Sequence, residues 1–147
     1  MKITDAFLGE HAVFYAQFGY MEQVIPGATS VMQVKTQGAM LKAALEGHAK
    51  LEEELLFKNL ESHIGPQGPL AVMRAEHDEI ERSLESLPSI QELAQAQALL
   101  LKVIEVARNH FAKEEQILYP IAQQTLSPEN LSDLGSEWAA HRSVNLR

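Results

Sequence analysis

Two copies of a His–Glu motif are the residues of this chain best suited to chemistry. Residues 48–57 read HAKLEEELLF, and residues 110–119 read HFAKEEQILY. In each copy a Glu, Glu52 or Glu114, follows the His by four positions. Four residues make about one helical turn, so the two side chains project from the same face of a helix. Imidazole with carboxylate is a ligand set for zinc and non-haem iron. The repeat therefore indicates metal chemistry on two helices.

Each copy is preceded by another Glu–His pair, Glu10-His11 in the first case and Glu76-His77 in the second. The chain therefore consists of two similar halves, and each half supplies one helix with a single His and one helix with His-x-x-x-Glu. If the halves pack about a pseudo-twofold axis, four His and at least two Glu meet in the middle of a bundle. Such side chains are seldom fully buried without partners.

A plainer interpretation exists for each of these residues taken alone. A single His in an apolar stripe is more often a hydrogen-bonded core residue, and a single Glu one turn later is more often a surface partner. The convergence of one His from each of four helices, with two turn-spaced Glu, favours a metal site. Without a cation or a complete hydrogen-bond network, a core does not hold so many polar groups cheaply.

Composition limits the class of protein. The chain has 147 residues, 46% of them hydrophobic, which is enough for one domain with a real core. The net charge of −8 argues against nucleic acid or an anionic membrane as a partner. The absence of Cys excludes disulfides and thiolate metal sites. No stretch reads as a signal peptide or a membrane span, so we expect a cytoplasmic protein.

Proline and glycine divide the chain into helical segments, and strand patterns are weak. We predict an all-α, up-down-up-down four-helix bundle over about residues 4–124, with a short extra C-terminal helix over about 128–142, all in one domain of residues 1–147. The expected bundle helices cover about residues 4–24, 30–61, a segment that begins at Pro69, and 90–124. In each of them the His falls in the apolar stripe that must face the core.

These motifs resemble those of haemerythrin-like proteins of the HHE cation-binding family. The resemblance covers about residues 4–122 and rests on Glu10-His11, Glu76-His77 and the two copies of the repeat. It implies a four-helix bundle that holds two non-haem iron ions. The ions would be Fe2+ or Fe3+, and an oxo group can bridge them. It also implies that Glu52 and Glu114 bridge the irons. The implied ligands are His11, His48, Glu52, His77, His110 and Glu114.

The sequence departs from oxygen-carrying haemerythrin in its third helix, where the carrier has a second His one turn after the first. Here that position is Glu81, which we predict as a seventh metal ligand. In the repeat Glu81 aligns with Tyr15, so one metal would be more anionic and Tyr15 would lie near the other. Carboxylates favour the ferric state, and we therefore expect redox reaction or sensing rather than reversible oxygen carriage.

Other polar residues are weaker candidates. We expect Glu53, Glu54 and Glu115 to be solvated or to accept a hydrogen bond from a ligand His. His63 and His141 are expected at the surface. The tyrosines Tyr15, Tyr20 and Tyr119 are expected to pack with a hydrogen-bonded hydroxyl, and Tyr15 is the only one of them expected near the site.

The leading hypothesis is a di-iron protein that binds, senses or reacts with O2, NO or peroxide. An iron or divalent-metal storage or metal-sensing module, without gas chemistry, is the alternative. A metal-free interaction domain is disfavoured by the cost of burying the His set, and a ferritin-like oxidase by its different Glu–His spacing. No motif for a specific catalytic residue is present, so whether the chain is an enzyme stays open.

Overall fold

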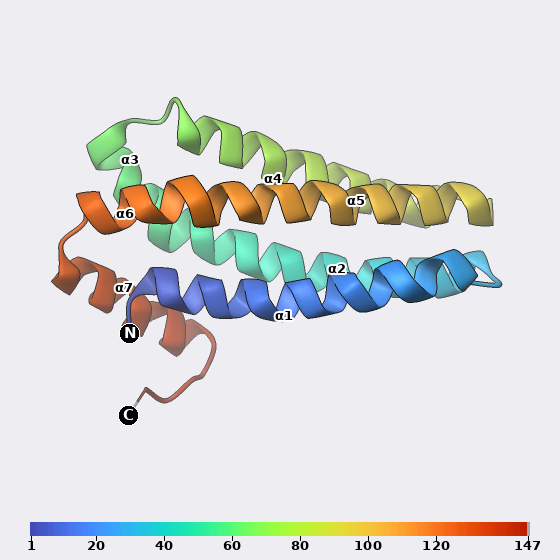
Figure 1. The fold of residues 1–147 in the computed structure, drawn as a ribbon, viewed down its shortest axis with the longest axis horizontal. Coiled ribbons are helices and arrows are strands. Elements are labelled where there is room, and N and C mark those ends of the chain that lie inside the picture. The colour runs from blue at the N-terminus through green and yellow to red at the C-terminus, as the bar shows by residue number, and fades with distance from the viewer. Residues whose placement is uncertain (147) are drawn as a thin grey trace.

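The structure is a computed structural model that describes residues 1–146. Four helical rods lie side by side, and in Figure 1 the colour runs along successive rods in alternating directions. The first rod is α1 (Ile3–Val24) and the third is α4 (Pro69–Ser86). The second contains α2 (Val31–Leu51), the π-helical turn η2 (Glu52–Phe57) and α3 (Lys58–Ile64). The fourth contains α5 (Leu93–Lys113), the π-helical turn η4 (Glu114–Leu118) and α6 (Tyr119–Thr125).

The remaining elements are short. The 3-10 turns η1 (Ile25–Gly27) and η3 (Leu87–Ser89) follow the first and third rods. A fifth helix, α7 (Pro128–His141), packs along the N-terminal end of α1 (Figure 1). Residues 1–146 contain no strand. The all-α class, the four main rods and the short C-terminal helix are therefore confirmed.

The helices begin where local chemistry favours it. The hydroxyls of Ser30 and Ser127 accept hydrogen bonds from the backbone N–H of Gln33 and Asn130, which caps α2 and α7. Pro69 occupies the first turn of α4, where its missing N–H leaves no helical hydrogen bond unmade. These caps fix the ends of the rods and so the heights at which their inward side chains meet.

The second and fourth rods each contain a π-helical turn, which the sequence analysis did not anticipate. Both turns begin at the Glu of the repeated motif, Glu52 in η2 and Glu114 in η4. A π turn carries hydrogen bonds from residue i to i+5, and its extra residue changes which side chains share a face. Such turns occur frequently at functional sites. Here they lie at matching places in the two halves.

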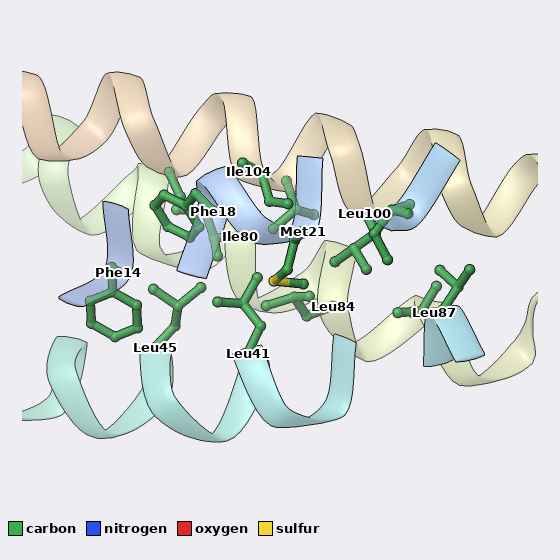
Figure 2. Packing of buried hydrophobic residues seen from close by; sticks show 14 of the residues in the cluster. Phe14, Phe18, Met21, Leu41, Leu45, Ile80, Leu84, Leu87, Leu100 and Ile104 are labelled. Carbon is green, nitrogen blue, oxygen red and sulfur yellow. The ribbon is translucent and has the colours of Figure 1, made fainter. Parts of the chain in front are cut away.

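The hydrophobic core has two parts, one on each side of the motif residues. The larger part contains Phe14, Phe18, Leu41, Leu84 and Leu100, and Figure 2 shows how these side chains meet between the rods. The smaller part includes buried residues of α1, α4 and α7, among them Phe7, Leu70 and Leu131. In every rod the motif His or Glu falls in sequence between residues of the two parts. The core therefore encloses the polar residues at both ends.

Helix α7 approaches the start of the chain very closely. A Cβ at Gly135 would collide with the backbone carbonyl of Met1, so a glycine allows this contact. Leu131 and Leu134 are buried in the smaller part of the core, and Trp138 packs against it. The apolar face of α7 is therefore seated on the bundle.

No helix in residues 1–146 is both long and apolar enough to span a bilayer.

Candidate metal centre

Six of the seven predicted ligands come together between the two parts of the core. They form two groups, and within each group one ligand atom from every residue lies within 4.8 Å of the others. Glu52 and Glu114 belong to both groups, which is the arrangement expected of carboxylates shared by two cations. The first group contains His11, His48, Glu52 and Glu114, and the second contains Glu52, His77, His110 and Glu114.

These side chains are shielded from water. Glu52 and Glu114 are fully buried, and so are His11 and His110, while His48 is 2% exposed. His77 has the most contact with solvent, with 10% of its side chain exposed. Burying charged carboxylates without compensation costs several kcal/mol or more for each group. The site therefore requires positive charge among these residues.

Four further carboxylates orient the imidazoles from outside. Nδ1 of His48 lies 2.6 Å from Glu10 Oε2, and Nδ1 of His110 lies 2.8 Å from Glu76 Oε2. Each of these contacts joins a motif His to the Glu–His pair of the same half. When Nδ1–H donates to an outer carboxylate, Nε2 is left to face the interior as a ligand atom.

The other two imidazoles are held by glutamates from the opposite half. Nδ1 of His11 lies 2.9 Å from Glu115 Oε1, and Nδ1 of His77 lies 3.3 Å from Glu53 Oε1. Glu53 and Glu115 were expected either to be solvated or to accept a hydrogen bond from such a histidine, and the second alternative holds for both. Glu10 and Glu76 play the same part, which the sequence analysis had not assigned to them.

Five interior atoms of the site lack hydrogen-bond partners. These buried atoms are Oε2 of Glu52, both carboxylate oxygens of Glu114, and Nε2 of His77 and His110. Nε2 of His110 lies 2.9 Å from Glu114 Oε1, but the two atoms do not have the geometry of a hydrogen bond. Nε2 of His11 and Nε2 of His48 lie 3.2 Å apart, within hydrogen-bonding distance of each other. Nitrogen and oxygen lone pairs that converge in this way fit a bound cation.

The protonation equilibria reflect the same negative field. Burial alone would lower the pKa of His48, but Glu52 and Glu10 outweigh it and raise the pKa to about 10. For His77, Glu52 and Glu53 likewise outweigh burial and raise the pKa to about 9. Protons and a metal ion compete for the same imidazole nitrogens. A field that holds protons here is also one that attracts a cation.

The π-helical turn η4 brings Tyr119 into the site. The residue five positions after Glu114 shares its face of the helix, and the Tyr119 hydroxyl donates a 2.6 Å hydrogen bond to Glu52 Oε1. The same hydroxyl lies 3.2 Å from Nε2 of His11. Burial, together with the charges of Glu52 and Glu114, raises the pKa of Tyr119 well above its usual value. Tyr119 therefore keeps its proton beside the ligands.

The hydrogen-bonded hydroxyls expected for Tyr119 and Tyr15 are confirmed. The tyrosine next to Glu52 and His11 is Tyr119, however, whereas Tyr15 alone was expected near the metal. Instead the Tyr15 hydroxyl donates a 2.9 Å hydrogen bond to Glu115, outside the ligands. Its pKa is raised to about 12 by burial and by that carboxylate. The position of Tyr119 at the end of the second motif indicates a place beside Glu114 only if the residues between them form a π-helical turn.

A comparison with protein families agrees with this geometry. The model of the family described as the Hemerythrin HHE cation binding domain matches residues 2–122. The chain belongs to this family. Comparisons with curated proteins and with solved structures gave no match. Membership of a cation-binding family and the buried His/Glu cluster together indicate that this HHE domain binds a metal cation.

Glu81 is the one predicted ligand that the structure does not bring to the others. It is exposed and belongs to neither group. At about 100° per residue, Glu81 lies roughly 60° from the centre of the apolar stripe of α4. Glu54, His63 and His141 are exposed as well, and the surface positions expected for the two histidines are confirmed.

An open cleft of about 750 Å³ leads from the surface to one side of this HHE domain's centre. Its lining comes from α2, η2, α4 and α5, and it includes His48, His77 and His110 but not His11. Lys50, Arg74 and Glu81 also line it. Of these three imidazoles His77 is the most exposed, so a small molecule in the cleft would meet His77 first.

Proposed function

We propose that this HHE domain binds two non-haem iron ions and uses them to bind, sense or react with a small diatomic molecule or peroxide. The observation that carries the proposal is the pair of overlapping ligand groups, which share Glu52 and Glu114. The six proposed ligands are His11, His48, Glu52, His77, His110 and Glu114. The up-down-up-down order of helices that we expect for the bundle would allow both halves to contribute equally.

Iron is the proposed metal because of its chemistry with these ligands. Imidazole and carboxylate together suit non-haem iron that retains an open coordination position. When bound, iron supplies the electrons for reaction with oxygen, nitric oxide or peroxide. The protein holds the two ions through shared carboxylates and keeps the imidazoles in one orientation through Glu10, Glu53, Glu76 and Glu115.

Other residues would control access and the position of a proton. The cleft admits a small molecule to His77 and His110, while the buried side chains around His11 exclude water from the other side. Tyr119 holds a proton on its hydroxyl oxygen next to Glu52 and His11. These features support chemistry that is confined to one entrance.

Anaerobic loading with Fe2+ tests the proposal. We expect two irons per chain by metal analysis, and visible absorption that changes when oxygen, peroxide or nitric oxide is admitted. A protein that takes up no iron, or one iron per chain, would contradict the two-ion centre. Two bound irons with no spectral response to any of these molecules would contradict the gas chemistry.

Two matched substitutions assign the ligands. Glu52→Gln removes a charge shared by both groups and is expected to abolish tight binding of both ions. Glu81→Gln makes the same chemical change at an exposed residue and is expected to leave binding unaltered. If Glu81→Gln also removes an ion, the metal-bound protein recruits Glu81 and the six-ligand assignment is wrong.

Metal storage or metal sensing is the second candidate function. It is favoured by the hydrogen bonds that Trp138 of α7 and the following Arg142 donate to Glu10. Both donors lie outside the matched residues 2–122. In that case bound metal would raise the melting temperature. At a metal concentration 100 times the dissociation constant, the free energy of unfolding would rise by about 2.7 kcal/mol, and no absorption band would respond to gas.

A further inference from the structure

Glu10 links the C-terminal segment to a ligand of the proposed metal centre. Its Oε2 lies 2.6 Å from Nδ1 of His48. Its Oε1 accepts a 2.9 Å hydrogen bond from the indole N–H of Trp138 and a 2.7 Å hydrogen bond from Nε of Arg142. Trp138 lies in α7 and Arg142 directly follows it. Both oxygens of the carboxylate are thus held, one by the site and one by the C-terminal segment.

The other half of the centre holds its equivalent carboxylate in a different way. Oε2 of Glu76 lies 2.8 Å from Nδ1 of His110, and its Oε1 is paired with the ammonium of Lys113. Lys113 belongs to the repeated motif itself and immediately precedes Glu114. In this half, the cation that pairs with the outer carboxylate of Glu76 therefore comes from α5, the helix that carries His110.

The first half lacks that local cation. The position of the first motif that corresponds to Lys113 is Leu51, which immediately precedes Glu52. Leu51 is buried in the same apolar cluster as Leu131 and Leu134 of α7. The leucine thus removes the partner of Glu10 and contributes to the surface on which α7 sits. The C-terminal segment then provides two donors in place of one lysine.

The electrostatics of Glu10 agree with this arrangement. The side chain of Glu10 is only 15% exposed, and the guanidinium of Arg142 balances its charge from the side opposite His48. Without Trp138 and Arg142, Oε1 would have to turn towards water, which would loosen the hydrogen bond made by Oε2.

We propose that Trp138 and Arg142 are positioning residues for His48, so that the docking of α7 controls how tightly the His11–His48 half holds its cation. The inference rests on the proposed metal binding and adds a coupling between that half and the C-terminal helix. Removal of an outer partner of a metal-bound His typically weakens metal binding about 10- to 100-fold. Because the other half uses Lys113, the effect is confined to one of the two ions.

Cobalt(II) titration of the full chain tests the inference without any gas chemistry. The double variant Trp138→Phe and Arg142→Met retains the apolar contacts and removes both donors. By competition with a chelator, we expect one of the two Co2+ equivalents to bind about 10- to 100-fold more weakly, with the other unchanged. Lys113→Met is the matched control, and it should weaken the other equivalent instead. The conservative variant Arg142→Lys keeps a cationic donor for Glu10, so it should retain most of the affinity that Arg142→Met loses.

A second measurement separates positioning from general stability. In the Zn2+-loaded protein, the Nδ1 proton of His48 should exchange with solvent faster in the double variant, while that of His110 should not change. Helix content should stay the same by circular dichroism. If the double variant loses helix content, the single variants Trp138→Phe and Arg142→Met are judged by the same two measurements.

The outcomes distinguish failure of the inference from failure of the proposed function. Two Co2+ equivalents bound with wild-type affinity by the variants would overturn the positioning role of α7. Equal weakening of both equivalents would also overturn it, since α7 would then act only on overall stability. Failure of the wild-type chain to bind two equivalents would instead overturn the proposed two-ion centre.

Discussion

His11 is closed off from the cleft, whereas His77, its counterpart in the other half, lines it. The ring of Phe111 stacks on His11, with centroids 3.9 Å apart and an interplanar angle of 11°. Phe111 directly follows the motif His110, and the matching residue of the first motif is Ala49, which lines the cleft with His77. A large side chain thus covers one imidazole, and a small one leaves the other accessible.

The aromatic residues that end the two motifs differ in a second way. Phe57 stacks on His77 with centroids 5.5 Å apart, and Tyr119 lies beside His11 with centroids 5.6 Å apart. Only Tyr119 adds a hydroxyl, which bonds to the shared Glu52. The repeat therefore supplies the proposed ligands twice, while a few replaced side chains leave His77 beside the cleft and cover His11.

The strongest test of this comparison removes one imidazole from each half. We expect His11→Gln and His77→Gln each to lose one metal equivalent, with affinity reduced beyond the roughly 100-fold that an outer partner can account for. Metal analysis and chelator competition measure this loss. Only His77→Gln should also remove the response to peroxide at the entrance. Loss of both ions in each variant would mean that the halves do not bind independently.

A smaller effect on metal release and on reaction with peroxide is expected when the cleft beside His77 is narrowed. Ala49→Phe places at the first motif the residue that covers His11 in the second, and the open cleft has room for it. Two metal ions should still bind, but extraction by a chelator and reaction with peroxide should slow several-fold in stopped-flow measurements. The control is Ala43→Phe, at an exposed position of α2 that does not line the cleft. Equal rates in both variants would show that the cleft is not the route.

The smallest effect is expected from removing the hydroxyl of Tyr119 beside His11. Tyr119→Phe leaves Oε1 of Glu52 without its hydrogen bond and is expected to destabilise the protein by about 1–3 kcal/mol. In thermal unfolding, each kcal/mol lowers the melting temperature by about 2–4 °C for a domain of this size. Tyr20→Phe removes a hydroxyl from an exposed tyrosine and should change nothing. An unchanged melting temperature for Tyr119→Phe would mean that water replaces the hydroxyl.

The helices and six clustered side chains could be predicted from the sequence because they depend on spacing. A His and a Glu one turn apart in an apolar stripe share a face whatever surrounds them. The same rule placed Glu81 inward, although it lies at the edge of its stripe. The one-turn rule does not indicate how far a residue lies from the centre of a face.

The contacts that distinguish the two halves were not predictable in this way. The π-helical turns have no separate sequence signal, so the position of Tyr119 next to Glu52 could not be found from α-helical spacing. The role of Glu10 depends on Trp138 and Arg142, which are distant in sequence and meet it only through the packing of α7. Long-range contacts of this kind require the tertiary structure.

A π turn holds one residue more than an α turn, so each motif contains one residue more than a regular α-helix would place there. If the residues after Glu114 formed a regular α-helix instead, Tyr119 would lie about 140° around the helix from Glu114 and would face away from Glu52. The reach of that hydroxyl is thus encoded by chain length rather than by residue type.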